Sequence, residues 1–140
     1  MGETMNKNWA RVLCVGNCSF DHQNITRVLV EHFEADVHSA ATADLAIQAV
    51  RDGRFDLILI NRVFDADGDS GLELIKRLQK NEGARSTPVM LVSNYTDAQT
   101  AAVNLGAKPG FGKSDLLSPE TRERVATVLH QNAAPKTGLK

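Results

Sequence analysis

Aromatic residues, cysteines and an excess of charge of either sign are all scarce in this chain of 140 residues. Phenylalanine, tryptophan and tyrosine make up only 5% of it, so aliphatic side chains must build the core. The formal net charge is −1, from 16 basic and 17 acidic residues. This balance provides no electrostatic footprint for nucleic acid or for an anionic membrane. We therefore expect no nucleic-acid partner.

Long apolar runs are also missing. No window approaches the roughly 20 apolar residues that a membrane span needs, and residues 1–6 contain no apolar run of a signal peptide. We therefore expect a cytoplasmic protein without membrane association, in which Cys14 and Cys18 are reduced. Together with His22 these cysteines could supply three metal ligands. Because Cys14 lies in an apolar run and no fourth ligand is evident, we predict no metal site.

What the sequence does contain is an alternation of five short apolar runs with five segments of helical periodicity. Strands are expected near residues 12–15, 36–38, 55–60, 88–93 and 109–113, and helices near 22–33, 42–52, 72–78, 96–106 and 118–129. This alternation predicts an α/β fold with a doubly wound parallel sheet. The length fits one domain, over residues 9–130. Residues 1–8 and 131–140 are predicted to be mobile tails.

Several polar residues mark the predicted starts of helices. Thr42 can cap the second helix, and Ser118 followed by Pro119 can begin the last one. Thr96 and Gln99 have the spacing of a capping box at the start of the fourth helix.

The reactive site of a doubly wound sheet lies at the carboxyl ends of its central strands. Gly16 and Asn17 follow the first strand, Asn61 ends the third, Ser93 the fourth and Lys113 the fifth. We therefore expect these five residues to meet at one edge of the sheet.

The chain resembles the receiver domain of two-component response regulators over about residues 9–130. The resemblance is carried, in order along the chain, by residues 11–15, 55–60, 71–75, 88–93 and 105–107, followed by Lys113. It implies a flavodoxin-like fold, in which a five-stranded parallel sheet lies between two layers that together contain five helices. It also implies a role in bacterial phosphorelay signal transduction.

The resemblance also shows what is lost. In the family, the first strand ends in two acidic residues that hold Mg²⁺, and these positions are Gly16 and Asn17 here. The aspartate that accepts the phosphoryl group corresponds to Asn61, whereas the family's hydroxyl and lysine residues are kept as Ser93 and Lys113. An amide is a far poorer nucleophile than a carboxylate, and Mg²⁺ usually needs carboxylate oxygens. We therefore expect no phosphorylation at Asn61 and no cofactor.

The charge of the site should change as well. Three aspartates and a lysine sum to −2 in the family, whereas the lysine alone leaves +1 here, so a cation is no longer favoured. The position of the family's switch aromatic falls on Gly110, with Phe111 beside it. Phe64 and Asp65 replace a Met-Pro pair, and the loop over residues 61–71 is longer than usual. These departures imply that phosphorylation no longer controls the surface formed by the family's helix four, strand five and helix five.

Our leading hypothesis is a degenerate, stand-alone receiver domain that is not an enzyme and acts by binding another protein. The candidate partners are a histidine kinase, another regulator, an output protein or a second copy of the chain. Two alternatives remain open. The chain could be an active phosphorelay receiver that uses Asp65, Asp67 or Asp69. It could instead sense a small anion or a nucleotide at the pocket around Lys113. If Lys113 binds no ligand, it could donate a hydrogen bond to the amide oxygen of Asn61 within the protein.

Overall fold

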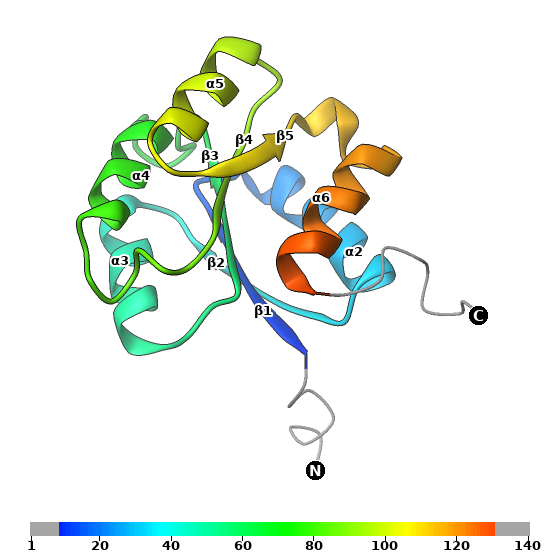
Figure 1. Cartoon of the computed structure of the whole chain (residues 1–140), viewed down its shortest axis with the longest axis horizontal. Helices are drawn as coiled ribbons and strands as arrows, with labels where there is room; N and C mark the ends of the chain where they lie inside the picture. Colours follow the sequence, from blue (N-terminus) through cyan, green and yellow to red (C-terminus); the bar gives the residue numbers. More distant parts are fainter. Residues whose placement is uncertain (1–8, 131–140) are drawn as a thin grey trace.

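The computed structural model describes residues 9–130, which form one five-stranded parallel sheet between two layers of helices (Figure 1). The strands are β1 (Ala10–Val15), β2 (Ala35–Ala40), β3 (Leu57–Asn61), β4 (Val89–Val92) and β5 (Lys108–Phe111). Their order across the sheet is β2-β1-β3-β4-β5. This flavodoxin-like order confirms the predicted fold class. The tails predicted over residues 1–8 and 131–140 lie outside the described residues.

The helices are α2 (Ser19–His32), α3 (Ala43–Asp52), α4 (Gly71–Gln79), α5 (Thr96–Asn104) and α6 (Pro119–Leu129), with a short 3-10 helix, η1 (Lys113–Asp115), before α6. One core lies under α3, α4 and α5, and a second core lies under α2 and α6 (Figure 1). Because both faces of the sheet are covered, residues 57–60 of β3 are all apolar and fully buried. Within residues 9–130, no helix combines the length and the apolar character needed to span a membrane.

Two of the three predicted helix starts are confirmed. The side-chain oxygen of Thr42 accepts a hydrogen bond from the backbone N–H of Leu45 at 3.2 Å. The Ser118 hydroxyl accepts from the N–H of Thr121 at 3.2 Å, and Pro119 is the first residue of α6.

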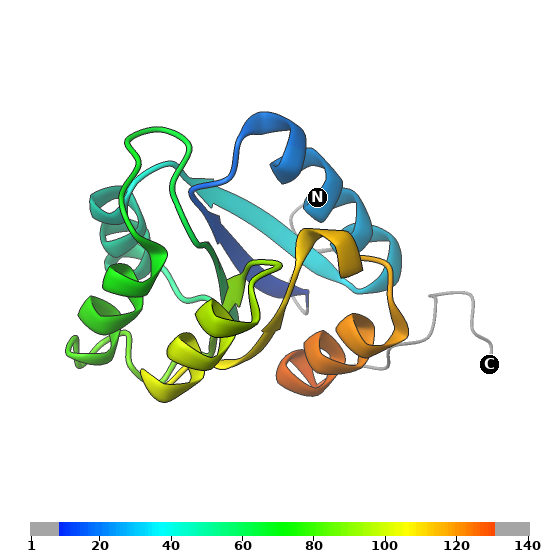
Figure 2. The same cartoon turned by 90° about the horizontal axis from the view of Figure 1, so that it is seen from above.

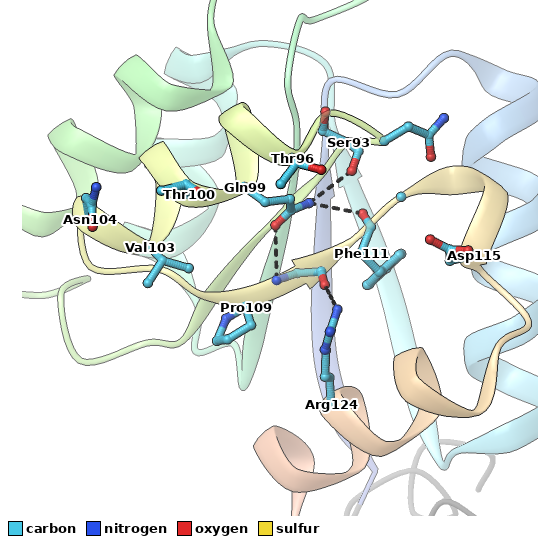
Figure 3. Close-up of a pocket in the computed structure, with 13 residues that line it drawn as sticks. Ser93, Thr96, Gln99, Thr100, Val103, Asn104, Pro109, Phe111, Asp115 and Arg124 are labelled. Atoms are coloured by element: carbon cyan, nitrogen blue, oxygen red, sulfur yellow. Dashed lines mark hydrogen bonds between the residues drawn. The ribbon is translucent and has the colours of Figure 1, made fainter.

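The predicted capping box of α5 is wrong. The residue that precedes α5 is Tyr95, which makes no side-chain cap bond, and Thr96 is already helical. The side chain of Gln99 points toward the sheet, where it bonds to the backbones of β4 and β5 (Figure 3). Because the Gln99 amide forms hydrogen bonds with the sheet, it does not take part in a capping box at the start of α5.

The boundaries of two weak strands also differ from the sequence-based expectation. β2 pairs with β1 along all six of its residues although half of them are polar. β5 begins at Lys108 and ends at Phe111, so that Lys113 lies in η1 rather than in the strand. In both cases pairing with a neighbouring strand, not apolar periodicity, sets the limits.

All five strands end at the same edge of the sheet, which we call the carboxyl edge. Figure 2 shows the loop after β3 rising there beside the segment that joins β1 to α2. The backbone N–H of Asp65 in this loop donates to the carbonyl of Gly16 at 2.9 Å. The fold therefore brings the predicted site residues to one edge.

Candidate functional site

The amide of Asn61 joins two chain segments at the centre of the carboxyl edge. Asn61 is 8% exposed, and its Nδ2 donates to the carbonyl of Gly16 at 3.1 Å and to that of Val63 at 2.8 Å. The end of β1 is thereby tied to the loop after β3. A carboxylate at this position could accept hydrogen bonds but could not donate to either carbonyl. Asn61 thus supplies donors that the phosphoacceptor of the family would lack.

The ring of Phe64 covers the place where the first acidic residue of the family would stand. Phe64 is 1% exposed, and a Cβ atom built on Gly16 would lie 2.2 Å from its Cδ1 atom. Gly16 also has a φ of 81°, in the left-handed region that favours glycine. An aspartate at residue 16 would therefore have to displace a buried aromatic ring. A carboxylate side chain at residue 16 and the buried ring of Phe64 therefore exclude each other in this arrangement.

The loop that carries the three alternative acceptors closes on itself. The N–H of Phe64 donates to the carbonyl of Asp69 at 2.9 Å, and Asp67 accepts from the N–H of Asp69 at 3.0 Å. The side chains of Asp65, Asp67 and Asp69 are exposed. Among the described residues, none of the three pairs with Lys113. The structure therefore does not bring these aspartates to the retained lysine.

Lys113 is neutralised by a residue that the sequence pattern did not single out. Its Nζ donates to the carboxylate of Asp21 at 2.7 Å, and the two side chains are 35% and 25% exposed. Lys113 does not donate to Asn61, so that predicted contact is wrong. Asp21 lies in the first turn of α2, 92 residues away in sequence. Its charge brings the site from the expected +1 to zero, which also corrects the predicted positive pocket.

Asn17 lies at the same edge, and both polar atoms of its amide are buried without a protein partner. Within residues 9–130, no group of three His, Cys, Asp or Glu side chains is arranged to hold a metal ion. Cys14 is buried in β1, and burial raises the pKa of its thiol to about 12. The thiol therefore stays neutral and is not a ligand in that form.

Ser93 is held by its neighbours at three points. Its N–H donates to the carbonyl of Phe111 at 2.9 Å, and its carbonyl accepts from Gln99 Nε2 at 3.1 Å. Its hydroxyl accepts from the N–H of Tyr95 at 3.1 Å. The Tyr95 ring itself lies under the guanidinium of Arg62, 4.7 Å from the ring centroid. The hydroxyl of Ser93 is thus engaged in the turn that leads into α5.

The position of the switch aromatic is closed to any side chain. A Cβ atom on Gly110 would lie 2.1 Å from the carbonyl oxygen of Leu91 in β4. Phe111 is 3% exposed and packs in the core under α2 and α6, on the opposite face of the sheet from α5. Neither residue can place an aromatic ring beside Ser93 on the α5 side.

The structure thus places all five predicted residues at the carboxyl edge, but among them a side-chain hydrogen bond joins only Asn61 and Gly16. Three residues that matter to the site were missed: Asp21, Phe64 in its buried position, and Gln99. For Gln99, the spacing from Thr96 predicts a capping role instead. The only signal for Phe64 was its departure from the family pattern, and Asp21 gave none.

A hollow of about 410 Å³ lies on the surface formed by α5, β5 and the middle of α6 (Figure 3). Its lining includes Thr96, Thr100, Val103, Pro109 and Arg124. It combines apolar groups with hydroxyl and amide groups. Such a surface can receive side chains of a protein partner.

The sequence profile of the response regulator receiver domain matches residues 12–113. Many solved structures are similar to this chain. The signal receiver domain of a DNA-binding response regulator from Colwellia psychrerythraea 34H has a TM-score of 0.73 and 18% identity, and the match covers 87% of this chain and 99% of that one. Chemotaxis response regulator CheY4 of Vibrio cholerae has a TM-score of 0.65 and 21% identity, with 87% and 97% covered.

NtrX from Brucella abortus matches with a TM-score of 0.70 and 18% identity over 85% of this chain, which corresponds to 28% of the NtrX chain. At these identities the solved structures establish the fold. None of the curated proteins matches.

Proposed function

Because the chain belongs to the response regulator receiver domain family, we propose that it takes part in two-component signalling by binding another protein, without accepting a phosphoryl group. Receiver domains are generally non-catalytic signalling modules that interact with proteins such as kinases and output domains. For this chain we propose the same, with no enzymatic activity and no bound cofactor.

The single observation that carries the proposal is the double donation by the amide of Asn61. At the position where the family has its acceptor carboxylate, this chain has a buried donor engaged with the carbonyls of Gly16 and Val63. Phosphoryl transfer depends almost entirely on positioning and on charge stabilisation. Here the nucleophile is absent, Phe64 fills the space of one metal ligand, and Lys113 is engaged with Asp21.

The alternative functions have weaker support. The three aspartates of residues 65–69 are exposed and do not pair with Lys113. A sensor of small anions would need a free positive charge, whereas Lys113 has a carboxylate partner at 2.7 Å. We also propose a cytoplasmic location, where Cys14 and Cys18 would stay reduced.

The hollow over α5 and β5 is the surface at which we propose that the partner binds. A histidine kinase, another regulator and an output protein are the candidate partners, with a second copy of the chain as a further one. Pull-down from native lysate with the wild-type chain and with a Val103→Asp variant identifies partners that depend on this surface. Val103 is 42% exposed and lines the hollow, so the substitution should abolish capture without unfolding the chain.

The test of phosphate uptake is an intact-mass measurement after incubation with a small phosphodonor and Mg²⁺. We expect no adduct on the wild-type chain, whereas a receiver domain with all three aspartates, treated in parallel, should gain one. An adduct that is lost in mild base would overturn the proposal. Loss of that adduct in an Asp65→Asn/Asp67→Asn/Asp69→Asn variant would then assign it to the alternative acceptors.

A further inference from the structure

The irregular pairing of β5 with β4 leaves backbone groups that ordinary ladder bonds do not satisfy. Met90 pairs with Lys108 and Val92 with Phe111, so β5 has one extra residue against β4. Such a bulge leaves the extra residue unpaired. Pro109, within the bulge, has no N–H to donate. The carbonyl of Leu91 and the N–H of Gly110 are bonded instead by a side chain outside the sheet.

The side-chain amide of Gln99 supplies these partners. Its Nε2 lies 2.9 Å from the carbonyl oxygen of Leu91 and 3.1 Å from that of Ser93, and it lies 3.4 Å from the Phe111 carbonyl. Its Oε1 accepts from the N–H of Gly110 at 3.2 Å. Both donors and the acceptor of the amide are used, which fixes the orientation of the group. Figure 3 shows the side chain reaching from α5 toward Ser93 and Phe111.

The same bulge is also held from the opposite side. The guanidinium Nη1 of Arg124, on α6, donates to the carbonyl of Gly110 (Figure 3). The N–H of Gly110 is thus bonded to α5 and its carbonyl to α6. The hydrogen bonds of Gln99, Gly110 and Arg124 therefore connect the three elements that surround the hollow described above.

We infer that Gln99 is the positioning residue that keeps the surface formed by α5, β5 and α6 in one shape, in place of switching by phosphorylation. The inference rests on the proposed function, because it concerns the surface that binds the partner. A shift of the Ser93 backbone toward Asn61 would break the bond from Gln99 Nε2 to the Ser93 carbonyl, and a rotation of its hydroxyl would break the bond from the N–H of Tyr95. These hydrogen bonds therefore hold Ser93 and the surface together in one arrangement, and residue 110 has no aromatic ring that could move with Ser93.

Amide hydrogen exchange measured by NMR on the whole chain tests this role. In a Gln99→Met variant, which keeps the length of the side chain but not its hydrogen bonds, the N–H of Gly110 should exchange about tenfold faster than in the wild type, because it loses its acceptor. The amides of β1 report on global unfolding and serve as the internal reference. Thr100→Ala, at an exposed neighbour that lines the same hollow, is the matched control and should change neither.

A Gln99→Glu variant separates a specific role from simple loss of packing. Its carboxylate keeps an acceptor for Gly110 but repels the carbonyls of Leu91, Ser93 and Phe111. Because the N–H of Ser93 donates to the Phe111 carbonyl, exchange should rise at Ser93 more than at Gly110. Unchanged exchange at Gly110 in Gln99→Met, or an equal rise in β1, would overturn the inference. The proposed function is tested by a different measurement. A phosphoryl adduct on the wild-type chain in intact mass would contradict the proposed function, whereas the exchange rates of the Gln99 variants would still test the role of Gln99.

Discussion

One amide group determines the chemistry at the end of β3. Asn61 and aspartate have nearly the same shape, but only the amide can donate to the carbonyls of Gly16 and Val63. A carboxylate would face two carbonyl oxygens in a site that is 8% exposed. Leaving buried groups unsatisfied costs about 1–3 kcal/mol each, and more when a charge is involved. The substitution that looks like a restoration is therefore destabilising.

We predict that Asn61→Asp lowers the free energy of unfolding by about 3 kcal/mol, measured by urea denaturation at neutral pH. The loss should be smaller in acid, where a protonated carboxyl group can donate one hydrogen bond. The matched control is Asn94→Asp, because the Asn94 Oδ1 only accepts, from the N–H and hydroxyl of Ser114. The control should change stability by less than about 1 kcal/mol, and equal losses in the two variants would contradict the donor role of Asn61.

At this scale the sequence predicted where the site residues lie in the fold better than it predicted which groups surround their side chains. Gly16, Asn61 and Lys113 could be placed at the carboxyl edge, because the ends of parallel strands must meet there. The partner of Lys113 could not be predicted, since Asp21 comes from a helix 92 residues away and belongs to no motif. One missed carboxylate was enough to give the site the wrong net charge.

At the scale of elements, β5 illustrates how a strand can form without a strand-like sequence. Its four residues include Pro109 and Gly110, yet pairing with β4 and bonds from α5 and α6 hold it at the edge of the sheet. Glycine is required at residue 110, because a Cβ atom would lie 2.1 Å from the carbonyl oxygen of Leu91.

Gly110→Ala should therefore force β5 away from β4 and cost about 1–3 kcal/mol, the usual range for overpacking. The control is Gly83→Ala, where the nearest atom to an added Cβ is 3.5 Å away and the backbone is not left-handed. Thermal unfolding followed by circular dichroism compares the two. A melting temperature for Gly110→Ala as high as that of Gly83→Ala would show that β5 adapts without strain.

Helix starts were predictable where the cap is a local matter and not where the sheet competes for the side chain. Thr42 and Ser118 bond within their own first turns, so spacing along the chain was sufficient. Gln99 has the same kind of spacing from Thr96, but the bulge of β5 offers its amide more partners than a helix start does. These partners become apparent only from the pairing register of β4 and β5, which the local sequence does not predict.

Across the whole molecule, the missing carboxylates are matched by changes in distant segments. Phe64 fills the space beside Gly16, Asp21 neutralises Lys113, and Gln99 fixes the strand that would otherwise carry the switch aromatic. Restoring acidic residues alone leaves these changes in place. We therefore expect that restoring the carboxylates alone does not allow phosphorylation at residue 61.

We predict that the triple variant Gly16→Asp/Asn17→Asp/Asn61→Asp gains no base-labile phosphoryl adduct in intact mass after treatment with a phosphodonor and Mg²⁺. The new side chain at residue 16 and the ring of Phe64 would occupy the same volume. Adding Phe64→Ala opens that volume, and the quadruple variant should then gain the adduct. Both variants are compared at a temperature at which circular dichroism shows them folded. An adduct on the triple variant would mean that the ring of Phe64 moves aside easily. A folded quadruple variant without an adduct would mean that another feature, such as the ion pair of Lys113 with Asp21, prevents phosphorylation.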